Sequence, residues 1–432
     1  MLMQRFSFLI LWCCSTSLMA QSFDAMVSIE PNYQNEFNLA SLKENQLFIS
    51  MPFAKQTVLN PEQKKKINEK VLIKLELVYT KYRKASSFNQ IKLNESRLIA
   101  LQKLAPLIFE NRFWDFDLIS QTNGNSRNEC DKMFHGFVLT FRPNSTPNTL
   151  DLEANYLENL AVALYQQDSV DADNKNRKYV IKTHYDLKIG YLHDTIWFKD
   201  TVKPVPPPDF FYNQTLYKDS TVLNAFDRNT IWKNFIVVTD VTGSMSPYSA
   251  QVFVWLKAQA QNKKAAYFVF FNDGDQKESA KKKPLETKGV YVAENKDLET
   301  VIKAATKCMR NGSGGGENLE NDVEAIIEGL KYYPNADEII LVADNYESMR
   351  DYEYFDKIKK PVHVILCGSE NRINIQYLNL ARQTKGTVHT VKSDVMNLQN
   401  IKEGEHLFID ENEYLYQNGK FHAVYSLLDK YK

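Results

Sequence analysis

The feature that most constrains the fold is a regular alternation of apolar runs and amphipathic stretches that begins near residue 234. The expected strands are Phe235–Thr239, Ala266–Phe271, Gly289–Ala293, Glu338–Ala343, Val362–Leu366 and Thr387–Val391. The expected helices between them are Tyr248–Gln261, Asp297–Met309, Leu319–Tyr332 and Ile375–Lys385. Strands that are apolar throughout are buried on both faces, which is typical of a parallel sheet covered by helices. Residues 234–392 are therefore predicted to form an α/β domain, a doubly wound and mainly parallel six-stranded sheet of Rossmann type.

The preceding part of the chain, residues 21–203, has a different pattern and is predicted to be an α+β domain of unrecognised type. Asn60-Pro61 starts an expected helix in which Ile67, Val71, Leu75, Val78 and Tyr82 follow at helical spacing. Later elements are a helix over Asn94–Arg112 that Pro106 should kink, a strand over Phe137–Phe141, a helix over Leu150–Tyr165 and a hairpin over Tyr179–Phe198.

The domain junction is expected at the proline-rich segment Lys203–Asp209, because such a run favours extended polyproline geometry. Residues 204–233 then serve as linker and lead-in to the α/β domain. Residues 393–432 form a C-terminal extension, in which Asn418-Gly419 between apolar residues predicts a β-hairpin.

The first twenty residues resemble a secretory signal, with Arg5 before the short apolar core Phe6–Cys14 and Ala20-Gln21 as the expected cleavage point. No other segment is apolar for long enough to span a bilayer. We therefore expect a secreted, periplasmic or cell-envelope protein without a membrane span. Lys+Arg and Asp+Glu both number 53, so the balanced charge argues against nucleic acid as a partner.

Cleavage of the signal would leave Cys130, Cys308 and Cys367. Three cysteines do not make a disulfide framework, although one bridge stays open to any pair of them. Cys308 and Cys367 lie in apolar contexts, so both are predicted to be buried and unreactive.

The segment Thr239–Ser246 carries the chemistry. An apolar strand ends in Asp240, hydroxyls follow at Thr242 and Ser244, and a helix begins after them. A carboxylate, hydroxyls and waters suit a hard cation such as Mg²⁺, with Mn²⁺ or Ca²⁺ as alternatives. The competing interpretation is a turn in which Ser244 or Ser246 only caps the helix.

This pattern resembles the metal-ion-dependent adhesion site of von Willebrand factor A and integrin-inserted domains, Asp-x-Ser/Thr-x-Ser. Further landmarks follow in order: the glycine-rich stretch Gly314–Glu320 before a helix, and a fourth strand, Ile339–Asp344, that ends in a second acid. The resemblance covers about 160 residues and implies the strand order 3-2-1-4-5-6. In that order Asp240 and Asp344 end the two strands at which the sheet order reverses, where ligands bind on open α/β sheets.

The resemblance implies a metal site formed by Asp240, Thr242, Ser244 and Asp344. Where many members of the family have a threonine ligand in the glycine-rich loop, this chain has Glu317 or Asn318. We place Glu317 in the metal site and Asn318 in its outer shell. Asp273 is a candidate outer acid, but a solvated Asp-Gly turn is the interpretation that the sequence favours for it.

The expected function is metal-dependent protein recognition or adhesion, in which the cation binds a carboxylate of a protein partner. One alternative is a structural component of an envelope assembly whose metal site only stabilises it. Another is a hydrolase that uses Cys130 with His135, His184 or His193. An aspartate-nucleophile phosphotransferase would need a second Asp where Thr242 stands. No enzymatic activity is therefore expected of the α/β domain.

Overall fold

The computed structural model describes residues 23, 26–39, 43–53, 61–68, 70–82, 87–110, 112–143, 146–172, 179–186, 190–197, 219–258, 264–312, 319–369, 372–410 and 412–424. The expected signal, the segment Lys203–Asp209 and the loop Gly314–Asn318 lie outside these residues. None of the described helices is both long and apolar enough to cross a bilayer.

The chain divides into two compact units, residues 1–143 with 423–432 and residues 144–422. The division lies N-terminal to the junction expected at residues 203–209. The reason is helix α6 (Pro147–Ala172), because its Leu150, Ala154 and Leu157 belong to the same buried cluster as residues of the second unit.

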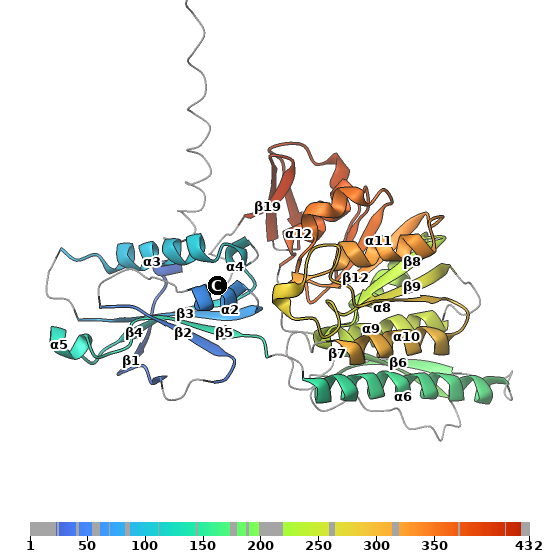
Figure 1. Ribbon diagram of the computed structural model, residues 1–432, viewed down its shortest axis with the longest axis horizontal. Helices are drawn as coiled ribbons and strands as arrows, with labels where there is room; N and C mark the ends of the chain where they lie inside the picture. The colour runs from blue at the N-terminus through green and yellow to red at the C-terminus, as the bar shows by residue number, and fades with distance from the viewer. Residues whose placement is uncertain are drawn as a thin grey trace, which may run out of the picture. The chain divides into compact units, whose positions relative to one another are not determined.

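The first unit contains a five-stranded mixed sheet in the order β1-β4-β3-β5-β2. Its strands are β1 (Asn32–Gln34), β2 (Gln46–Ser50), β3 (Leu72–Thr80), β4 (Asp115–Gln121) and β5 (Gly136–Phe141). Its helices are α2 (Pro61–Asn68), α3 (Gln90–Leu104), α4 (Leu107–Glu110) and α5 (Arg127–Cys130). Figure 1 shows α3 along one face of this sheet.

The prediction that helix α2 continues past Val71 is wrong, since α2 ends at Asn68 and Leu72–Thr80 is strand β3. β3 pairs with β4 on one side and β5 on the other, so it is central in the sheet. Residues of both its faces are buried, among them the neighbours Leu77 and Val78, which hides the period of two that marks a strand. The break at Pro106 is confirmed, because α3 ends at Leu104 and α4 begins at Leu107.

The second unit is built on a seven-stranded, mostly parallel sheet in the order β10-β9-β8-β12-β14-β15-β16. The strands are β8 (Phe235–Asp240), β9 (Ala265–Phe271), β10 (Val290–Glu294), β12 (Glu338–Asp344), β14 (Val362–Cys367), β15 (Val388–His389) and β16 (Asp394–Val395). β10 and β16 are antiparallel to their neighbours, while the strands between them run parallel. Seven strands replace the predicted six because the two-residue strand β16 folds back onto β15.

Helices cover both faces of this sheet (Figure 1). They are α8 (Thr221–Arg228), α9 (Ser246–Ala258), α10 (Leu298–Asn311), α11 (Asp322–Tyr332) and α12 (Ile375–Gln383). Successive side chains of β8 point to opposite faces of the sheet. Phe235 and Val237 join the cluster that includes α8, α9 and α10. Ile236 points to α11, where a Cβ on Gly329 would lie 2.9 Å from its Cδ1.

The remaining elements of this unit are short or peripheral. They are the hairpin β6 (Tyr179–Asp186) and β7 (Gly190–Trp197), the pair β11 (Leu319–Glu320) and β13 (Ser348–Met349), the three-stranded sheet β17 (His406–Ile409), β18 (Asn412–Gln417) and β19 (Lys420–Val424), and the 3-10 turns η2 (Gly243–Met245), η3 (Ser279–Lys281), η4 (Tyr352–Lys357) and η5 (Leu398–Asn400). Both predicted hairpins are confirmed.

Candidate metal centre

Asp240 is the last residue of β8 and is 1% exposed. Its Oδ1 accepts a hydrogen bond of 2.7 Å from the backbone N–H of Thr242, so the carboxylate shapes the turn that follows the strand. The Thr242 hydroxyl is buried and has no hydrogen-bond partner among the described residues. A buried polar atom without a partner costs free energy, which a cation at this point would recover. The Ser244 side chain lies outside the described part of the site.

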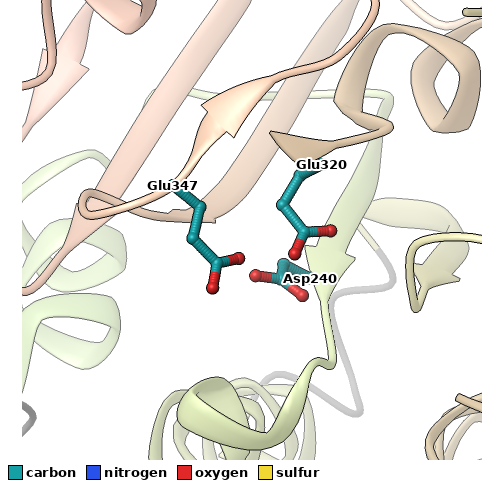
Figure 2. Close-up of side chains that lie close together, drawn as sticks. All are labelled: Asp240, Glu320 and Glu347. Carbon is teal, nitrogen blue, oxygen red and sulfur yellow. The ribbon is translucent and has the colours of Figure 1, made fainter. Parts of the chain in front are cut away.

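Two glutamates that the sequence did not single out join Asp240. One carboxylate oxygen from each of Asp240, Glu320 and Glu347 lies within 4.8 Å of the others, and all three residues are buried. Figure 2 shows the three carboxylates pointing toward one another from different segments of the chain. Carboxylates of like charge repel, and a cation bound between them would relieve that repulsion.

The pair β11 and β13 places the two glutamates. Leu319 lies beside Ser348 and Glu320 beside Met349 in a short parallel ladder, and the Arg350 N–H donates to the Glu320 carbonyl over 2.6 Å. The loop that carries Glu347 is held from the other side, because the Asn374 amide donates to the Glu347 carbonyl over 2.8 Å. Backbone contacts therefore fix both side chains at the edge where β8 and β12 end.

The electrostatics of Glu320 fit a cation site. Burial raises the pKa of its carboxyl well above the usual range, and repulsion from Asp240, Asp273 and Asp322 raises it further. The nearby Lys282 acts in the opposite direction. A bound divalent cation would reverse this balance by favouring the charged carboxylate.

Asp344 ends β12 and lies at the same edge as Asp240, but its carboxylate is not one of the three that converge. Its Oδ1 accepts a 2.9 Å hydrogen bond from the Tyr346 N–H. It is placed to orient the loop that leads to Glu347.

Asp273 is buried rather than part of a solvated turn. It binds Lys282 Nζ at 2.7 Å and Arg350 Nη2 at 3.1 Å. These two basic side chains balance the charge of Asp273. Its role is therefore to neutralise Lys282 and Arg350 beside Asp240, Glu320 and Glu347. Glu317 and Asn318 lie outside the described residues.

The sequence did contain a signal for the two missed glutamates. Glu320 follows the glycine-rich loop, and Glu347 comes three residues after the strand-ending Asp344. The expectation that a helix starts at Leu319 concealed the first, since Leu319–Glu320 is a strand and α11 begins only at Asp322.

Comparison of the chain with family models, with curated proteins and with solved structures finds no match.

Proposed function

We propose that residues 234–392 form a von Willebrand factor A-like recognition module that binds one divalent cation through Asp240, Glu320 and Glu347. The observation that carries the proposal is the convergence of these three buried carboxylates at one edge of the sheet. Hard cations take oxygen ligands, and carboxylates are the commonest charged ones.

The fold supports the family part of the proposal. When the strands β8, β9, β10, β12, β14 and β15 are numbered 1 to 6 along the chain, their order in the sheet is 3-2-1-4-5-6. Strand β16 is added at the end of that order. Aspartates end the first and the fourth of these strands. The strand order reverses between those two strands, and such a reversal is the usual ligand site of open α/β sheets.

The charge of the site argues for a cation that the chain itself neutralises. Three carboxylates and one divalent ion leave a net charge of −1 (−3 + 2) at positions that are 0–2% exposed. A partner's carboxylate would then approach a negative centre, which is unfavourable. We therefore propose that the cation holds the edge of the module together, and that the partner's acidic side chain expected from the family pattern is not needed to complete the site.

The spacing of the carboxylates suits Mg²⁺ and Ca²⁺ alike. Ligands on opposite sides of the ion are separated by about 4.2 Å around Mg²⁺ and about 4.8 Å around Ca²⁺, twice the metal–oxygen distance in each case. The three oxygens lie within 4.8 Å of one another, so either ion could be bound between them.

The proposal includes export, for which the signal-like N-terminus is the support. The hydrolase alternative has less support, because Cys130 is fully buried and its thiol donates to the Gly124 carbonyl. A nucleophile needs access to its substrate. A structural envelope component remains the second candidate, since an internal cation would serve it equally well.

Calorimetry and thermal unfolding of the chain without its signal, with Ca²⁺, Mg²⁺ and Mn²⁺, test the proposal. We expect saturable binding of one ion and a higher Tm with the ion, by mass action. Glu347→Gln should lose both effects while remaining folded. Addition of a short acidic peptide should leave cation affinity unchanged. Absence of heat and of a Tm shift at millimolar cation would refute the metal site, whereas tighter cation binding with the peptide would restore the partner-completed version.

A further inference from the structure

Strand β10 ends the seven-stranded sheet, and among the described residues β9 is its only paired neighbour. Its first four residues, Val290–Ala293, carry no charge, no proline and no bulge relative to β9. Edge strands that do not pair with other chains are usually protected by a charged residue, a proline or a bulge. This edge is therefore open to an added strand.

The register shows which backbone groups face outward. Asn272 N–H donates to the Gly289 carbonyl and Asn295 N–H to the Ala266 carbonyl, so Gly289 and Asn295 belong to the hydrogen-bonded pairs with β9. These pairs alternate along an antiparallel ladder, so Tyr291 and Ala293 also point their backbone groups at β9. Val290, Val292 and Glu294 consequently direct their N–H and C=O groups away from the sheet.

A cavity of about 330 Å³ lies along the same strand. Besides residues of β10, it is lined by Asp275, Lys288, Gly289, Glu324, Glu328 and Tyr332. Glu324, Glu328 and Tyr332 are four residues apart along α11, so they form one stripe on that helix. Tyr291 and Ala293 belong to the α10 side of the sheet, so Val290 and Val292 face the side of this stripe. A strand added to β10 would pass beneath α11.

The cavity is negatively charged, with three acids against one lysine in its lining. Among the described residues, two of the acids are held by neutral donors only. Glu324 accepts the backbone N–H groups of Thr287 and Lys288, each over 2.8 Å. Asp275 accepts the Tyr291 hydroxyl over 2.9 Å and the Asn272 amide. Neutral donors orient a carboxylate without cancelling its charge, so both remain available to attract a cation.

Tyr332 completes the lining and is 61% exposed. An aromatic ring beside carboxylates suits the aliphatic stem and charged head of a lysine or arginine. Within the described part of the chain, Glu328 forms an ion pair only with the exposed Lys331 of its own helix. A cation from a partner could replace Lys331 at little cost, because an exposed ion pair contributes little free energy.

We propose that the outer edge of β10 binds an extended segment of a partner protein as an added strand, with a lysine or arginine of that segment entering the acidic cavity beneath α11. This interaction surface is separate from the metal centre. Main-chain bonds to Val290, Val292 and Glu294 would supply affinity, and the basic side chain would supply specificity.

Fluorescence anisotropy on the full chain tests the proposal with a labelled peptide, Thr-Val-Lys-Val-Thr-Val, and the same peptide with Glu in place of Lys. Saturable binding of the lysine peptide is expected, and binding of the glutamate peptide should be weaker by about tenfold. Val292→Pro removes one outward N–H without touching the bonds to β9, because proline is tolerated where its missing N–H faces solvent. It should weaken binding about tenfold, while Val292→Thr, which keeps the N–H group, should change it by less than about twofold.

Glu328→Gln gives a second measurement that does not involve the strand, and we expect it to weaken the lysine peptide more than the glutamate peptide. Equal binding of both peptides, or unchanged binding by Val292→Pro, would overturn the proposal. So would a dimer in sedimentation that Val292→Pro dissociates, because the edge would then belong to a second copy of the chain. Failure of cation binding at Asp240 leaves this test unaffected.

Discussion

Asp240 and Asp344 end two adjacent parallel strands, and each accepts a hydrogen bond from the backbone N–H two residues further along the chain, over 2.7 and 2.9 Å. The local turns are alike, but the surroundings differ. The Asp240 carboxylate meets Glu320 and Glu347, whereas Asp344 stands outside that group. In the proposed metal site, the same residue type at the same kind of position would have two roles, ligand and support.

The paired substitutions Asp240→Asn and Asp344→Asn separate these roles, since asparagine keeps an oxygen that can accept the turn hydrogen bond. We expect Asp240→Asn to abolish calorimetric binding of Ca²⁺, because it removes one of three charged ligands. Asp344→Asn should weaken binding without abolishing it, by roughly 10- to 100-fold, the effect of a group that orients a ligand loop. Equal losses in the two variants would contradict the distinction.

Glu320→Gln should stabilise the protein without a cation and remove its response to the cation. Burial and three neighbouring acids raise the pKa of Glu320, so its charged form opposes folding until an ion binds. Each kcal/mol of relief corresponds to roughly 2–4 °C in Tm for a unit of this size. Thermal unfolding with and without Ca²⁺ measures both effects.

Asp273→Asn is the matched control for that experiment. It also removes a buried acid at this edge, but one that already binds Lys282 and Arg350. Breaking a buried ion pair from one side costs roughly 3–5 kcal/mol, so Tm should fall while the cation-induced rise persists. A rise in Tm would show that Asp273 is not neutralised as its contacts indicate.

Much of the second unit was predictable because its strands are buried on both faces and read as continuous apolar runs. Phe235–Asp240 and Val362–Cys367 are buried at every position. Asp240 was predictable for the same reason, since a carboxylate directly after such a run must lie at the sheet edge. Strand β3 was not predictable, because burial on both faces of this leucine-rich strand imitates the spacing of a helix.

Glu320 and Glu347 depend on a contact that no local pattern encodes. They meet because the two-residue strands β11 and β13 pair across a separation of nearly thirty residues. Strands this short have no periodicity to detect. The convergence of the three acids is therefore a tertiary property, although each acid taken alone stands at a position where the chain turns.

A fragment that begins at residue 144 should unfold cooperatively and be more stable than one that begins at Tyr212, the boundary that the proline-rich segment predicts. The shorter fragment lacks α6 and so exposes the core positions beneath Leu150 and Leu157. It also loses the hydrogen bond between buried Glu153 and Ser246, at the start of α9. Exposing two leucine sites costs roughly 3–6 kcal/mol. Equal unfolding free energies in urea would mean that α6 adds nothing to this unit.

The stability of the second unit should depend on His363 below neutral pH. His363 is 8% exposed on β14, and its Nδ1 lies 2.7 Å from the Thr387 hydroxyl. Burial lowers the pKa of this histidine to about 4, with a smaller contribution from His389. Glu338 lies 3.7 Å from Nε2, too far for a hydrogen bond, so it does not offset burial.

Because the folded pKa lies below the ordinary value of about 6.5, the unfolded chain binds the proton first as pH falls. The contribution of neutral His363 is complete above pH 6.5 and is lost as pH falls toward 4, by up to about 3 kcal/mol. Other acids titrate in this window, so the measured quantity is the difference in unfolding free energy between wild type and His363→Gln. That difference should shrink from pH 7 to pH 4.5. The same substitution at the exposed His422 provides the control, and a gap that stays constant with pH would show that burial does not lower the pKa of His363.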